Sequence, residues 1–177
     1  MEEESKDMMV LGAIKNGVKK FDKIQRAAQI DSEELNSILE KLERRELITV
    51  EEKKGWLGKK IEIKTTEKGS KEVEERIHEL QGKWDQMSMI YKSGDKQKLK
   101  QYMDDNKSIL PMMIFFGVMD MIMFSMMFSM MGMMMTDYVP AESIPDGAGE
   151  ADGGGSDGGG SDGGGSDGGG FDFDVGF

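Results

Sequence analysis

The chain has 177 residues, enough for one ordinary domain with appendages, and no cysteine, so disulfides, thiol catalysis and cysteine-ligated metals are excluded. All 23 Lys and Arg lie in residues 1–107 together with 23 of the 34 acidic residues, so the remainder supplies the net charge of −11. This balance excludes a strongly basic nucleic-acid-binding protein, although it is compatible with local basic patches. The acidic N-terminus has no apolar run after it, which predicts a cytoplasmic protein without a secretory signal.

The N-terminal part of the chain has the pattern of three short helices and a hairpin. Apolar residues at helical spacing predict helices over 8–14 and 21–30, and Asp31 is typical of the N-cap of a third helix. Residues 47–50 and 60–64 alternate between apolar and polar, which predicts two paired strands. This order is the winged helix-turn-helix plan. We therefore expect a mainly α fold with a small β-hairpin, followed by long helices and a disordered tail.

Two motifs resemble a known family. Residues 31–48 (DSEELNSILEKLERRELI) resemble the recognition helix and following strand of MarR- and PadR-like winged helices, and residues 65–69 (TTEKG) resemble the start of their next helix. The resemblance implies a winged helix-turn-helix domain over residues 1–70, a fold that serves DNA, RNA or protein binding. Frequent Lys and Glu without Cys also resembles thermophilic archaeal proteins. Small archaeal ribosome-associated dimerisation or hibernation factors are a second class to which the chain is similar.

The predicted recognition helix carries acids where a DNA-reading helix usually presents cations. Glu33, Glu34 and Glu40 occupy its first turns, and acids there would repel phosphates. Its cations come late, where they complement the helix dipole. Sequence-specific DNA reading through this helix is therefore disfavoured. Its candidate contact residues are Asn36, Ser37, Lys41, Arg44 and Arg45.

The predicted wing is basic and has an aromatic tip. Such a hairpin suits a phosphate backbone together with a stacking or apolar contact. The alternative is a solvated charged turn with Trp56 folded onto the domain. Further lysine clusters at 15–26 and 92–100 can be solvated faces. The candidate nucleic-acid or ribosome contacts on the wing are Lys53, Lys54, Trp56, Leu57, Lys59 and Lys60.

Residues 71–107 are predicted to form a helical dimerisation region. A long helix begins near Glu67 and breaks at Gly94, before a short helix over 95–105. Its apolar residues follow a heptad spacing, which indicates either packing on its own domain or a dimer seam. The resemblance favours the dimer, because such winged helices usually pair through the helix after the wing. The seam residues are Val73, Ile77, Leu80, Trp84, Met87 and Tyr91.

Residues 108–136 are predicted to form one apolar helix, since the 27 residues from 109 to 135 hold 12 of the 18 methionines. A buried core or oligomerisation helix is favoured over a membrane span and over a groove for hydrophobic peptides. The run is long enough for a bilayer, but Asp120 near its centre would cost about 2.5–3.5 kcal/mol there. Small residues between 117 and 136 fall near one stripe that would allow close helix contact. The apolar candidates are Met112, Met113, Phe116, Met119, Met123, Met127 and Met130.

Residues 137–177 are predicted to be a flexible acidic tail. A Gly-Gly-Gly-Ser-Asp repeat over 153–167 cannot bury enough apolar surface to fold, and residues 146–170 would span about 25–30 Å as a random coil. The ending FDFDVGF suits docking into an apolar groove with a basic rim, or strand addition. The alternative is that it folds back on the Met-rich helix. The residues of this motif are Phe171, Phe173 and Phe177.

The sequence predicts a binding protein rather than an enzyme. It has no recognisable catalytic constellation, and the single histidine, His78, has no second histidine to share a metal, so we expect neither metal nor cofactor. The favoured function is that of a homodimeric factor that binds a nucleoprotein assembly, and a ribosomal subunit is the preferred partner. Its acidic tail would bind a basic protein of that assembly. The alternatives are a MarR/PadR-like DNA-binding transcription regulator and, disfavoured, a membrane-anchored winged-helix protein.

Overall fold

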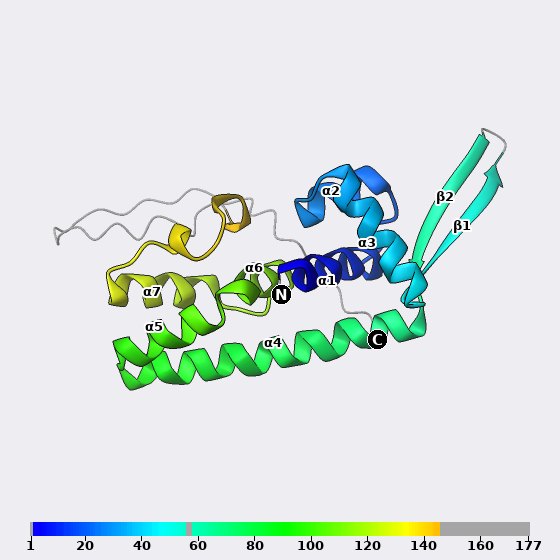
Figure 1. Cartoon of the computed structure of the whole chain (residues 1–177). Coiled ribbons are helices and arrows are strands. Elements are labelled where there is room, and N and C mark those ends of the chain that lie inside the picture. Colours follow the sequence, from blue (N-terminus) through cyan, green and yellow to red (C-terminus); the bar gives the residue numbers. More distant parts are fainter. Residues whose placement is uncertain (1, 56–57, 146–177) are drawn as a thin grey trace, which may run out of the picture.

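The computed structural model describes residues 2–55 and 58–145 and confirms the expected fold class, mainly helical with a hairpin. The tail motif of Phe171, Phe173 and Phe177 lies outside the described residues. Figure 1 shows the hairpin projecting from a helical body, along which one long helix runs. The winged helix-turn-helix elements are α1 (Glu2–Lys15), α2 (Phe21–Ala28), α3 (Ser32–Arg44), β1 (Ile48–Gly55) and β2 (Gly58–Thr65).

The turn between α2 and α3 is fixed by local chemistry that the sequence displays. Gln29 ends α2 in the left-handed conformation at φ 54°. Asp31 then caps α3, because its carboxylate accepts a hydrogen bond of 2.8 Å from the Glu34 amide, as predicted. The apolar face of α3 is buried against α1 and β1, and it consists of Leu35, Ile38, Leu39 and Leu42.

The hairpin is antiparallel and leads directly into α4 (Glu67–Ser93). Thr66 caps this helix, accepting from the Gly69 amide at 3.0 Å and donating its hydroxyl to the Glu46 carbonyl at 2.7 Å. The start of α4 therefore lies against the start of β1. A Cβ added to Gly69 would lie 2.1 Å from the Leu47 carbonyl oxygen, so only glycine allows this approach.

The heptad seam of α4 packs inside its own chain. Val73, Leu80 and Met87 are almost fully buried, Trp84 is 9 % exposed, and Ile77 and Tyr91 are partly buried against the same core. This corrects the dimer-seam interpretation, because α5 (Lys96–Asp105) and α1 already contact α4. Homodimer formation stays a prediction, but these side chains are not its contact surface.

The Met-rich segment is not the single helix that its composition predicts. It is divided into a short 3-10 turn over Lys107–Ile109, α6 (Leu110–Phe115) and α7 (Met121–Met131). Gly117 breaks the run at φ 62°, and Gly132 ends α7 at φ 67°. The predicted small-residue stripe is therefore not continuous. Asp120, which in the sequence counts against a membrane span, is the N-cap of α7.

These helices build the second half of one core. Met112, Met113, Met119 and Met127 are buried, and the remaining candidates pack partly buried against them, namely Phe116, Met123 and Met130. None of the helices in the described part of the chain combines the length and apolar character needed to cross a bilayer.

A row of aromatic rings connects α4 to the last described segment. Trp84 meets Phe124 edge-on with ring centroids 6.4 Å apart, and Phe124 meets Phe128 at 4.9 Å. Phe128 in turn contacts Tyr138 at 5.3 Å, next to short 3-10 turns at Met135–Asp137 and Ala141–Ser143. Edge-on pairs of this kind add to the free energy of burial. The chain beyond α7 is thereby held on the body of the protein.

Gly69→Ala and Gly82→Ala, in the same helix, are expected to move stability in opposite directions. The Cβ at position 69 forces α4 away from β1, at a cost of about 1–3 kcal/mol. At Gly82 a Cβ meets nothing within 4 Å, so alanine stabilises the helix by about 0.5–1 kcal/mol. Urea denaturation measures both free energies of unfolding. A Gly69→Ala variant as stable as the parent would contradict the close contact.

Asp120→Ala is expected to destabilise the protein by about 1 kcal/mol through loss of the α7 cap. The Asp120 carboxylate accepts from the amides of Ile122 and Met123 at 2.9 and 3.0 Å. Asp120→Asn keeps an acceptor at this position and should lose much less. Thermal unfolding of the two variants checks the difference, and equal losses would argue against a capping role.

Candidate nucleic-acid interface

A groove of about 390 Å³ lies between α3, the loop before α2 and one face of the hairpin. The register pairs Val50 with Ile63 and Glu52 with Ile61, so Val50, Ile61 and Ile63 share that face. Val50 and Ile61 remain 39 % and 58 % exposed. The groove is lined by Lys19, Lys20, Phe21, Asn36, Leu39, Glu40, Glu43, Val50, Ile61 and Ile63.

Four of the five recognition-helix candidates, Asn36, Ser37, Arg44 and Arg45, are exposed, and Asn36 lines the groove. Lys41 and Arg45 are engaged in ion pairs with other helices of the domain. Lys41 lies 2.6 Å from the nearly buried carboxylate of Asp7 in α1, and Arg45 lies 2.6 Å from Glu72 in α4. These two cations hold α3 in place.

The lysines before α2 belong to the same surface as α3 and the hairpin. Lys19 and Lys20 are exposed and line the groove beside Asn36. In the sequence the lysines of 15–26 form a separate cluster, because the local pattern does not show how α2 packs relative to the wing. The helix-turn-helix packing brings it there, since α2 starts immediately after these lysines.

Glu62 organises the base of the wing, a role that sequence analysis missed. Its carboxylate lies 2.6 Å from Lys53, 3.4 Å from Lys19 and 3.6 Å from Lys64. The hydrogen bond from Lys53, aided by Lys19, lowers the pKa of Glu62 from 4.5 to about 2. The stability that this carboxylate contributes is therefore present above pH 4.5 and lost as the pH falls toward 2. In the sequence, this role of Glu62 is indicated only by the alternation of residues 60–64 (KIEIK), which places lysines on either side of it.

The wing lysines divide between the two faces of the hairpin. Lys53 is on the face of Glu62, and Lys54 is on the face of Val50 that lines the groove. The backbones of Lys59 and Lys60 pair with those of Lys54 and Lys53. The side chains of these last two lysines, and all of Trp56 and Leu57, lie outside the described residues.

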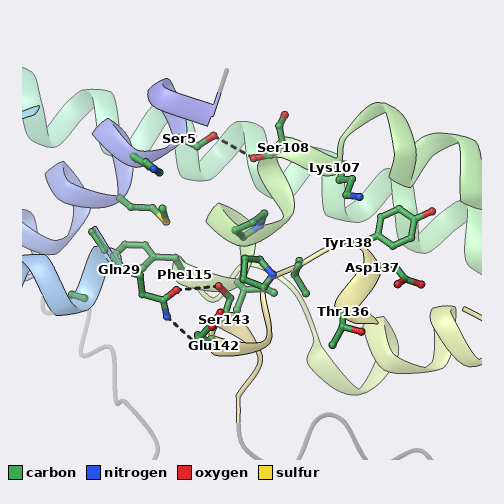
Figure 2. A pocket seen from close by; sticks show the side chains of 18 of the residues that line it. Ser5, Gln29, Lys107, Ser108, Phe115, Thr136, Asp137, Tyr138, Glu142 and Ser143 are labelled. Atoms are coloured by element: carbon green, nitrogen blue, oxygen red, sulfur yellow. Dashed lines mark hydrogen bonds between the residues drawn. The ribbon is translucent and has the colours of Figure 1, made fainter. Parts of the chain in front are cut away.

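A second, larger cavity of about 950 Å³ separates the N-terminal domain from the last described segment. In Figure 2, Ser5 donates to the Ser108 carbonyl at 3.4 Å, and Gln29 donates to the Glu142 carbonyl at 3.1 Å. Tyr138 donates to Asp104 at 2.6 Å, and desolvation together with this carboxylate raises its pKa to about 12. The bonds of Gln29 with Glu142 and Ser143 join the end of α2 to the C-terminal segment.

Comparison with protein families matches residues 4–92 to the HxlR-like helix-turn-helix family. The matched half of the chain contains α2, α3, the hairpin and almost all of α1 and α4, and thus the whole groove surface. Neither the curated proteins nor the solved structures give a match. The winged helix-turn-helix prediction is confirmed, whereas archaeal origin and the ribosome-factor resemblance gain no support. The chain belongs to the HxlR-like helix-turn-helix family.

Proposed function

We propose that this protein is a DNA-binding transcription regulator, the alternative that the sequence offered, rather than a ribosome-associated factor. The observation that carries the proposal is the coincidence of the family match with the groove surface, where α3, the wing and the pre-α2 lysines meet. Helix-turn-helix domains of this plan place the second helix of the motif in the major groove. None of the comparisons supports a ribosomal subunit as the partner.

The charges on this surface can be assigned to separate tasks on DNA. Lys19 and Lys20 are exposed in the groove beside α3, and Lys54 is exposed farther along the hairpin on the face that lines the groove, so all three suit the phosphates that flank a major groove. Between them, Asn36 and Glu40 line the groove. Asparagine pairs with adenine and glutamate accepts from the cytosine amino group, so the acids of α3 suit base reading where cations hold the backbone.

The acids of α3 would repel phosphates, but in this arrangement they are compatible with DNA binding. A glutamate near the centre of the helix faces base edges rather than the backbone, provided that lysines at the margins fix the register. Lys41 and Arg45 are not needed for this, since they bind Asp7 and Glu72. The proposal leaves the chain without a catalytic role, in agreement with the regulatory character of helix-turn-helix families.

Lys20→Gln is expected to weaken binding to duplex DNA and to reduce the slope of log K against log salt by about 1, the value of one lost phosphate contact. Lys98→Gln is the matched control, because Lys98 is an exposed lysine of α5 outside the groove. Fluorescence anisotropy with a labelled random-sequence duplex gives both slopes. The proposal is wrong if the parent shows no salt-dependent binding, or if both variants lose equally.

Glu62→Gln is expected to tighten duplex binding, because it removes the carboxylate that engages Lys53, Lys19 and Lys64. With a pKa near 2, Glu62 is fully ionised near neutrality, so the gain should not change between pH 6 and about 8. The same anisotropy titration measures it. Glu51→Gln, on the same hairpin face, is the control and should have a smaller effect, because the Glu51 carboxylate lies 4.0 Å from Lys64, farther than the 2.6 Å between Glu62 and Lys53. Weaker binding by Glu62→Gln would show that this carboxylate positions the lysines for DNA.

A further inference from the structure

The groove beside α3 has an exposed apolar wall, which DNA binding alone does not require. Its apolar wall, with Val50 39 % and Ile61 58 % exposed, is continued by Phe21 and Leu39. Lys19 and Lys20 form a lysine rim of the groove, which Glu40 and Glu43 of α3 also line. An apolar trough with lysines in its lining fits a short peptide that alternates aromatic and acidic residues.

The chain itself contains such a peptide. Residues 171–174 alternate Phe and Asp, and Phe177 follows after a short spacer. In an extended peptide the two phenylalanines share one face and the two aspartates the other. The aromatic face then meets Ile61 and Val50, while the aspartates are available to Lys19 and Lys20. After Lys107 the chain has 11 acids and no base, so the lysine rim is also complementary to the whole segment.

The last described residues lie close enough to the groove for this peptide to reach it within one chain. Gln29, just after α2, donates to the Glu142 carbonyl at 3.1 Å, and Ser143 donates to Gln29 at 3.4 Å. Phe21, in the groove, is at the other end of α2, about 12 Å away along the helix. A random coil of 25 residues, the length of 146–170, spans about 25–30 Å.

We propose that residues 171–177 bind in the groove between α3 and the hairpin of the same chain and thereby compete with DNA. The peptide occupies the apolar trough, and its acids neutralise the lysines that would hold phosphates. A tether of this length gives an effective concentration on the order of 1 mM, so even a weak peptide contact, with a dissociation constant of about 0.1 mM, reduces DNA affinity about tenfold. The competition rests on the proposed DNA-binding function, whereas the docking does not.

The exposed apolar face of α7 is the competing location for the same peptide. Ile122 and Met126 are 71 % and 52 % exposed there. Helix α7 itself contains no basic residue, and its N-cap is Asp120, which would repel an acidic peptide. The groove also contains two acids, Glu40 and Glu43, but its Lys19 and Lys20 can pair with the aspartates, so charge favours the groove. Matched substitutions of Ile61 and Ile122 separate the two locations.

The docking is tested without DNA, on the full chain carrying Phe171→Ser, Phe173→Ser and Phe177→Ser, whose own motif no longer competes. The probe is a fluorescein-labelled peptide of sequence FDFDVGF, followed by anisotropy. Adding Ile61→Ser should weaken peptide binding at least tenfold, and adding Ile122→Ser should leave it unchanged. Both are exposed positions, and a thermal scan checks that each variant is folded. No binding, or the reverse pattern, overturns the placement.

The competition is tested by titrating the labelled duplex with the parent chain and with the triple Phe→Ser variant. The variant should bind about tenfold more tightly. Equal affinities overturn the competition, while a lack of duplex binding by both proteins overturns the DNA-binding function and leaves the peptide result standing. If the parent self-associates on gel filtration and the triple variant does not, the peptide binds a second copy, which overturns the assignment within one chain.

Discussion

The structure depends above all on the burial of one face of α4. Near its start, Gly69 lies against the hairpin and Val73 is buried in the N-terminal domain; near its end, Trp84 and Met87 pack among the C-terminal helices. A single helix of 27 residues thus joins two halves that have no separate cores. Burial of large apolar side chains is the main favourable contribution to folding. The burial of this face of α4 therefore sets the position of the wing relative to α7.

Short-range patterns allowed the winged helix-turn-helix to be predicted almost completely. Asp31 and Thr66 cap helices through bonds to residues three positions ahead, and such bonds need no tertiary information. The heptad spacing of α4 is equally recognisable in the sequence, but the segments that cover its apolar face are not. A row of apolar residues every three or four positions shows that a helix face is buried, without showing whether the same chain or a second one covers it.

The errors after residue 107 have a common cause. Composition counts apolar residues and ignores where the backbone can turn, so a run of methionines with one acid was interpreted as one helix. Gly117 at φ 62° and the cap at Asp120 divide it instead. At the candidate interface, composition likewise does not show which lysines are engaged in ion pairs within the protein. Lys41 and Lys20 are both surface lysines in sequence, yet the first is tied to Asp7 and the second lies at the groove.

The two halves of the core differ in the kind of side chain that fills them. Around α3 the buried residues are mainly leucine and isoleucine, whereas between α4 and α7 they include Met103, Met112, Met113 and Met127. Methionine is unbranched and adapts to irregular gaps, so exchanges with leucine or among methionines cost little. The C-terminal half can therefore change its sequence during evolution with little loss of stability. Relatives of this chain should keep the α3 core and diverge fastest over residues 109–135.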